Sequence, residues 1–221
     1  MKRISIIRLL LSVAFVALIS LSLPHDTEGR QSSNMNVLRI TDTIPLSGKS
    51  ERPMHSSITF PTVRGSNLEG KDFVLPGDFG GTLNLLFVAF QREQQAMVNT
   101  WLPFAKTLSE RYLQVSYYEL PTIERLNPLF QWFINRGMRS GIPDSTARAT
   151  TITLYLDKPT FREALNIPHE DTIYVFLVND TGQVVWRAAG VRTNEVSGEL
   201  QDVIRLYRQS PNRPYNKTVT P

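Results

Sequence analysis

Hydrophobic and polar positions divide the chain into three stretches of different character. The first holds an uncharged, almost wholly apolar run, residues 9–23, behind three basic residues among the first eight. This arrangement is typical of an export signal, whereas a mitochondrial presequence would be amphipathic. Small residues suit cleavage after Ser22, and residues 4–23 are long enough to stay as a membrane anchor. We expect an exported protein, periplasmic or otherwise extracytoplasmic; cleavage, retention in the inner membrane and a mitochondrial location stay open as alternatives.

A polar stretch without a periodic apolar face follows at residues 24–57. It is rich in Pro, Ser, Thr and Asn and cannot bury enough apolar surface to offset the entropy of ordering the chain. The last residues are rich in proline and polar side chains. The expected organisation is an export signal or N-terminal membrane anchor (1–23), a flexible linker (24–57), one domain (58–209) and a flexible tail (210–221).

Strand patterns open the domain. Residues 58–63 and 71–75 alternate in polarity and flank a glycine-bounded stretch, 65–70, which predicts a hairpin with a loop. Residues 83–90 are almost continuously apolar, which is typical of a central strand covered on both faces. The domain should therefore have a sheet at its centre.

Helical periodicity alternates with strand patterns from there on. Apolar residues at helical spacing predict a helix over 97–112, with a kink at Pro103. Asp157 can cap a short helix that runs through Leu165. The other expected elements are a strand at 114–119 parallel to 83–90, a helix from Leu126 to about Gly137 followed by a loop to Ala149, a strand at 150–156, a hairpin of 172–178 with 183–187, and a helix over 194–207.

Composition excludes several kinds of chemistry. The chain has no cysteine, so thiol catalysis, disulfides and cysteine-ligated metals are absent by inventory. Two of the three histidines, His25 and His55, lie in the expected linker, which argues against a histidine metal site. The 24 basic and 20 acidic residues become nearly balanced once the amino-terminal basic residues are set aside, which argues against nucleic-acid binding. No phosphate loop or serine elbow is present, and we expect no cofactor or metal.

The order of elements resembles the thioredoxin-like fold, with an amino-terminal hairpin as in the peroxiredoxin-like branch. The resemblance implies an α/β, three-layer fold with a central mixed sheet. Residues 88–90 resemble the strand before the redox motif of thioredoxins, and Pro103 stands at the same separation as their helix-kinking proline. This register places the two motif cysteines on Gln95 and Val98, and the cis-proline near Ile173, so all three functional residues are missing.

Several short motifs are most similar to the mitochondrial ATP synthase assembly factor family and its bacterial relatives. That family resembles thioredoxins without working cysteines and helps a membrane-sector subunit to assemble, which would make this chain an assembly factor. The chain departs from the family in its secretory-type signal. The motifs are Phe90-Gln91-Arg92, Trp101-Leu102-Pro103-Phe104, Gly141-Ile142-Pro143, and Ala164-Leu165-Asn166-Ile167-Pro168 running into 174–178.

Three aromatic residues within four positions are the strongest candidate for a binding surface. Phe130, Trp132 and Phe133 are too closely spaced to share one helix face, so at least one should be exposed or cover the following loop. Exposed aromatics beside Arg136 and Arg139 would have the composition of a protein-binding hot spot. The alternative is that they form a core plug under the loop.

Other polar residues have weaker cases. Arg92, next to a helix amino terminus, is a candidate anion site. The stretch 169–171, His-Glu-Asp, should be a solvated turn, because three consecutive residues cannot converge on one point. Glu119 and Glu124 stand at a strand end, where α/β proteins place sites, but have no nucleophile beside them.

These expectations favour an exported, redox-inactive, membrane-associated pseudoenzyme that binds another protein, such as a subunit of a membrane complex, as an assembly or folding helper. The alternative is a peroxiredoxin- or thioredoxin-related oxidoreductase that acts with the cysteines of a partner.

Overall fold

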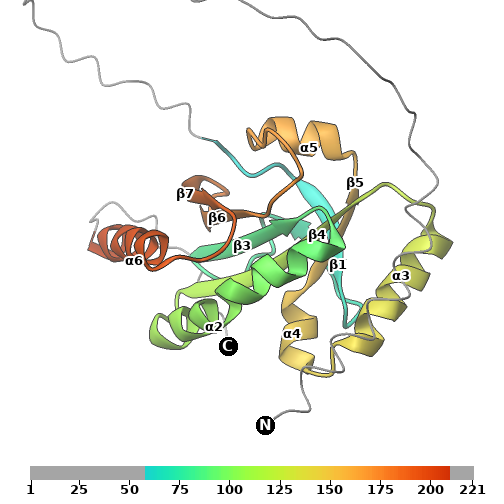
Figure 1. Ribbon diagram of the computed structural model, residues 1–221, viewed down its shortest axis with the longest axis horizontal. Coiled ribbons are helices and arrows are strands. Elements are labelled where there is room, and N and C mark those ends of the chain that lie inside the picture. The colour runs from blue at the N-terminus through green and yellow to red at the C-terminus, as the bar shows by residue number, and fades with distance from the viewer. Residues whose placement is uncertain (1–57, 210–221) are drawn as a thin grey trace, which may run out of the picture.

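A seven-stranded mixed sheet forms the centre of the computed structural model, which describes residues 58–209 (Figure 1). The expected export segment, linker and tail lie outside the described residues. The strand order is β2-β1-β5-β4-β3-β6-β7. The strands are β1 (Val63–Asn67), β2 (Asp72–Leu75), β3 (Leu83–Ala89), β4 (Val115–Glu124), β5 (Ile152–Leu156), β6 (Tyr174–Asn179) and β7 (Val184–Ala189). The helices are the short 3₁₀ turn η2 (Arg92–Gln94), α2 (Gln95–Arg111), α3 (Pro128–Gly141), α4 (Ser145–Thr150), α5 (Lys158–Ala164) and α6 (Asn194–Gln209).

The central part of the sheet confirms the thioredoxin-like fold. β3 lies between β4, to which it is parallel, and β6, to which it is antiparallel. Its side chains are buried from Leu83 to Val88 because both faces of the strand are covered. The helix α2 connects the parallel strands, and the β6–β7 hairpin and α6 follow at the end of the domain. This element order is the one expected from the sequence.

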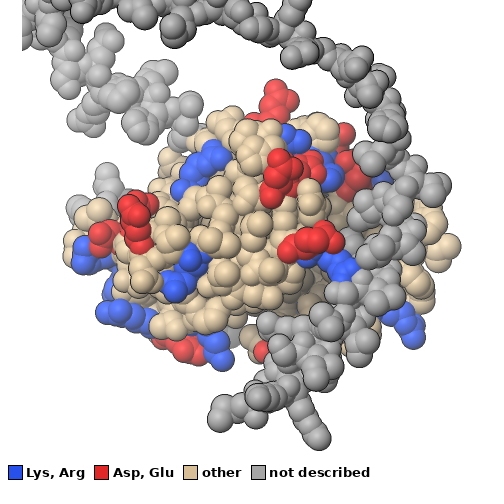
Figure 2. Space-filling view, in the orientation of Figure 1, with Lys and Arg blue, Asp and Glu red and all other residues tan. Residues whose placement is uncertain are grey.

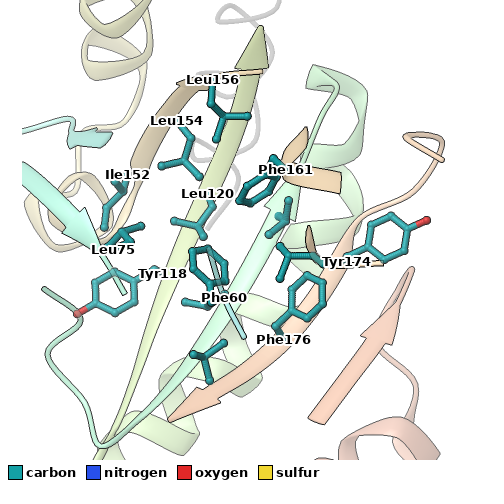
Figure 3. Packing of buried hydrophobic residues seen from close by; sticks show 14 of the residues in the cluster. Phe60, Leu75, Tyr118, Leu120, Ile152, Leu154, Leu156, Phe161, Tyr174 and Phe176 are labelled. Carbon is teal, nitrogen blue, oxygen red and sulfur yellow. The ribbon is translucent and has the colours of Figure 1, made fainter. Parts of the chain in front are cut away.

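Helices pack on both faces of the sheet through two apolar clusters, so the domain has three layers. One cluster, shown in Figure 3, joins sheet residues such as Leu120 and Phe176 to Phe60 and to Phe161 of α5. Phe60 and Phe161 meet edge to face, with ring centroids 5.8 Å apart. The other cluster packs α2 and α6 on the opposite face around Trp101, which is fully buried. The Trp101 indole donates a hydrogen bond to the Gly190 carbonyl at 2.9 Å.

The first hairpin forms with a different register from the expected one. Strand β1 begins at Val63, so Gly65 and Asn67 belong to the strand and not to the loop. A side chain at Gly65 would collide with β5, since an added Cβ would lie 2.7 Å from Leu154 Cδ2. The turn is closed by Asn67, whose Oδ1 accepts hydrogen bonds from the backbone amides of Glu69 and Lys71. Glycine therefore marks a close strand contact here, not a turn.

Strand β4 extends further than expected, through Pro121 to Glu124. It pairs with β3 as far as Pro121 and with β5 from Thr122 onward. The proline thus lies where the strand changes partners and where its missing N–H matters least.

The region after β4 is more helical than expected. Helix α3 passes through Gly137 and ends at Gly141, shortly before Pro143. The expected loop contains α4, whose first turn is capped by Asp144 through a bond from the amide of Thr146. Six residues are too few to display an amphipathic repeat, which explains why the pattern missed this helix. The expected cap at Asp157 is confirmed, because its side chain accepts from the Thr160 amide and starts α5.

Local contacts occupy parts of both sheet edges. At the β2 edge, the Val74 amide donates to the Asp78 carboxylate at 2.6 Å. Beside β7, the backbone of Phe60 donates to the Gly182 carbonyl and the Val184 amide donates to the Ile58 carbonyl. Among residues 58–209, no helix has the length and apolar character needed to cross a bilayer.

Candidate functional site

The positions that the sequence register assigns to the redox cysteines, Gln95 and Val98, lie in the first turn of α2. Gln95 is exposed, and its Nε2 donates to Glu119 Oε2 at 2.8 Å and to Asn99 Oδ1 at 3.3 Å. Val98 is buried in the cluster around Trp101. The first position is therefore an amide on the surface and the second is core, and neither offers a nucleophile.

A loop before β6 is tied onto the turn that precedes α2. The Glu170 carbonyl accepts hydrogen bonds from Gln94 Nε2 at 2.5 Å and Gln91 Nε2 at 3.2 Å. The side-chain carboxylate of Glu170 forms salt bridges with Lys158 at 2.5 Å and with Arg162 at 3.3 Å. These bonds join α5, the loop and η2 into one polar contact beside the degenerate motif.

This contact corrects the expectation of a solvated turn at 169–171 for one of its three residues. His169 and Asp171 are exposed, but Glu170 is only 22% exposed and fully engaged. The sequence does contain an indication of this contact on α5. Lys158 and Arg162 are four positions apart, so they lie on one helix face, where a single acidic side chain can pair with both.

The backbone amides next to Arg92 donate hydrogen bonds to a side chain of the same turn. The Oε1 atom of Gln94 accepts from the amide of Phe90 at 2.8 Å and from that of Gln91 at 3.3 Å. These amides therefore have partners within the turn. The anion site at Arg92 stays a prediction.

Glu119 and Glu124 do not form a pair. Glu119 is 8% exposed and bonded to Gln95, whereas Glu124 is exposed at the end of β4. Five strand positions separate them by about 16 Å. The pKa of the neighbouring Tyr117 is raised, first by burial and then by the negative charge of Glu119, Asp144 and Glu110. Among the described residues, no group of three or more histidine and carboxylate side chains could hold a metal ion.

Helix α3 turns its apolar side chains away from the protein. The exposed fractions are 72% for Leu129, 39% for Phe130, 57% for Trp132 and 54% for Phe133. The single buried side chain of the helix is Ile134. The expectation of at least one exposed aromatic is confirmed, and the alternative of a core plug is wrong.

The polar side of α3 faces the sheet instead. The Tyr155 hydroxyl of β5 donates to Asn135 Oδ1 at 3.0 Å and lies 3.3 Å from the Gln131 carbonyl. Asn135 in turn lies within 3.5 Å of the Ser66 hydroxyl of β1. Because this part of the sheet presents polar side chains, the helix meets it with polar residues and its apolar residues remain outside.

The two arginines of α3 differ in their contacts. Arg136 lies over the Trp132 ring at 5.3 Å and holds it by a cation–π contact. Arg139 pairs with Glu69 at 3.1 Å, and the same carboxylate also binds Arg148 of α4. Arg139 therefore also fixes α3 to the first hairpin. We call Leu129, Phe130, Trp132, Phe133 and Arg136 the α3 surface.

Charges of both signs are interspersed on the face shown in Figure 2, around a broad uncharged centre. That face presents no wide cationic area of the kind that a nucleic-acid backbone requires.

Comparisons with known proteins found matches among solved structures. No protein-family model matches the chain, and a search of curated proteins found no match. A protein from Aquifex aeolicus is 14% identical, with a TM-score of 0.49, over 70% of this chain and 99% of its own. Yeast Sco1 with copper bound is 15% identical, with a TM-score of 0.45, over 70% and 96%. The thioredoxin domain of a thiol-disulfide oxidoreductase from Bacteroides vulgatus is 14% identical, with a TM-score of 0.43, over 66% and 96%. These structural neighbours are proteins of the thioredoxin-like fold, the fold that the topology of this chain displays.

Proposed function

We propose that the chain is an exported, redox-inactive thioredoxin-like protein that binds another protein, as an assembly or folding helper at a membrane. The observation that supports it best is the α3 surface, where four large apolar side chains lie exposed on one helix. Contiguous exposed apolar patches on soluble domains mark interaction sites.

The composition of the α3 surface suits protein recognition. Trp and Arg are enriched in binding hot spots, and Arg136 already holds the Trp132 ring in place. Helix α3 contains two arginines and no acidic residue. A second copy of the same helix would bring like charges together, so the complementary partner is a different surface, apolar with acidic residues around it.

The redox part of the proposal rests on inventory and packing. The chain has no cysteine, and the corresponding positions hold an exposed amide and a buried valine. Thiol exchange requires an attacking thiolate, which this chain cannot supply itself.

The test measures partner capture and stability for one substitution. The full chain, solubilised in mild detergent, is used to capture its partner from the native membrane. Trp132→Ala should lower capture at least tenfold, since a hot-spot truncation costs about 2 kcal/mol or more, while the unfolding midpoint changes little. In contrast, Trp101→Ala removes a buried ring and should cost about 3 kcal/mol or more of folding stability.

The matched control is Leu113→Ala, which removes an even more exposed apolar side chain, 94% against 57% for Trp132, in the loop after α2. It should leave capture unchanged. If Trp132→Ala lowers the unfolding midpoint strongly and capture stays the same, the α3 surface is structural and the binding site lies elsewhere. Insulin reduction or peroxide turnover above buffer by the purified full chain would contradict the redox-inactive assignment.

A further inference from the structure

A pocket of about 360 Å³ lies on the sheet beside α3. Strands β1, β2 and β5 form its floor and Gln131 of α3 contributes to its wall. The polar side chains that line it are Arg64, Ser66, Asp72, Gln131, Thr153 and Tyr155. No part of the proposed protein-binding function uses this pocket.

The polar floor follows from strand alternation. Ser66 is in register with Asp72 on one side and with Thr153 on the other, so these three side chains share a face of the sheet. Gly65 and Leu154, one position along, belong to the opposite face, where Leu154 joins the apolar core. One face of this sheet region is therefore apolar core and the other is a polar pocket.

One cationic and one anionic side chain line the pocket, and they form no salt bridge with each other. Arg64 and Asp72 are exposed, and neither forms a salt bridge or hydrogen bond within residues 58–209. In the register of β1 and β2, Arg64 faces Val74 whereas Asp72 faces Ser66. The two residues are thus diagonal neighbours on one face of the sheet, about 7–8 Å apart at the backbone, and both line the pocket.

A buried hydroxyl without a partner lies in the same floor. Thr153 is fully buried, and its Oγ1 has no hydrogen-bond partner in the described part of the chain. Nearby, the Tyr155 hydroxyl uses its proton on Asn135, so its oxygen can still accept a bond. Buried polar atoms are normally bonded, so this unpartnered hydroxyl adds polar character to the floor of the pocket.

The lining disfavours other ligand classes. A phosphate would meet a single cation, Arg64, and would be repelled by the carboxylate of Asp72. A hydrocarbon would leave the hydroxyls and charges unpaired. A calcium ion takes six to eight oxygen ligands, and Asp72 is the sole acidic residue among those lining the pocket.

We propose that this pocket binds a small zwitterion of the α-amino acid class, with its carboxylate on Arg64 and its ammonium group on Asp72. The guanidinium offers the paired donors that a carboxylate accepts. The ammonium group donates to Asp72 and to the neighbouring hydroxyl oxygens.

The experiment measures binding of the common amino acids to the full chain in detergent by calorimetry and by the unfolding midpoint. At least one amino acid at about 10 mM should raise the midpoint by about 2 °C or more, as expected for a ligand that binds the folded state. The same compound with its amine acetylated, or with its carboxylate amidated, should bind about tenfold more weakly. Glucose and inorganic phosphate serve as a neutral and an anionic comparison.

Two substitutions test the assigned charges. Asp72→Asn and Arg64→Gln should each weaken binding at least tenfold. Both side chains are exposed and unpaired, so the unfolding midpoint without ligand should stay the same. Asp180→Asn, an exposed acid in the β6–β7 turn, is the matched control and should bind normally.

Three results would overturn the proposal: no amino acid binds the folded chain, both blocked compounds bind as tightly as the free one, or binding survives Asp72→Asn and Arg64→Gln. An unfolding midpoint that stays constant with every compound would be the first of these results. The outcome is separate from that of the proposed function, because Trp132→Ala should bind the amino acid normally and Asp72→Asn should still capture the protein partner.

Discussion

Two glycines illustrate, at the scale of single residues, how differently the same residue type can act. Gly65 lies in β1 against β5, where an added Cβ would come within 2.8 Å of the Thr153 carbonyl oxygen as well as touching Leu154. Gly137 lies inside α3, and an added Cβ there would meet nothing within 4 Å. The first glycine is required by packing, and the second only weakens its helix.

Alanine substitutions at these two positions should change stability in opposite directions. Gly65→Ala forces two strands apart and should cost about 1–3 kcal/mol of unfolding free energy. Gly137→Ala adds a better helix former without a collision and should gain up to about 1 kcal/mol. Urea unfolding of both variants checks this. Equal effects of the same sign would mean that the contact between β1 and β5 is looser than described.

Tyr155 should make the free energy of unfolding depend on pH in the alkaline range. Burial raises the pKa of its phenol well above the ordinary value of 10.0. The folded state therefore holds the proton at a pH where the unfolded chain has lost it. This contribution to stability is complete below pH 10 and decreases as the pH rises toward the folded-state pKa.

Comparing the protein with Tyr155→Phe isolates this effect. The variant should be less stable by about 1 kcal/mol at neutral pH, because the bond to Asn135 is lost. Above pH 10 its disadvantage should shrink, since phenylalanine does not titrate. Denaturant unfolding at about pH 8 and about pH 11 measures both values. A difference that stays constant across this range would contradict the burial of the phenol.

At the scale of elements, the first turn of α2 allows a test of the register that assigns Gln95 and Val98 to the redox cysteines. The exposed Gln95 and the buried Val98 stand three positions apart at the start of the helix. Cysteines at this spacing can reach disulfide geometry.

The double substitution Gln95→Cys with Val98→Cys should therefore form an intramolecular disulfide under air or copper oxidation. Free-thiol titration and mass spectrometry of the unfolded product would detect it. Gln95→Cys alone is the control and should keep its thiol. A double variant that stays fully reduced would show that the register built on Phe90 and Pro103 is wrong.

Helix α3 shows where sequence patterns mislead at this scale. Its apolar repeat, which includes Leu129, Phe133 and Ile134, is of the kind that helices commonly bury, and the structure buries only Ile134 of the three. The reason lies in another element, because β1 and β5 present Ser66 and Tyr155 to the helix. A local repeat reports amphipathicity but not which side the rest of the chain will cover.

Across the whole molecule, the order of elements was predictable because strands and helices have different apolar periods. The buried strand β3, the long helix α2 and the final hairpin follow directly from such patterns. The pairing of β1 with β5 was not predictable, since it joins segments far apart in the sequence. The pocket depends on this long-range pairing, and the bond from Gln94 to the Glu170 carbonyl joins residues 76 positions apart, so residue types alone did not reveal either of them.

The occupied sheet edges affect how copies of this protein behave when crowded together. An open strand edge is a template for fibril growth and for partners that add a strand. Here Asp78 takes the outward amide of Val74, and backbone bonds from Ile58 and Phe60 cover the start of β7. Cross-β stacking at these positions would first have to break the native bonds, so the covered parts of both edges resist the addition of a further strand.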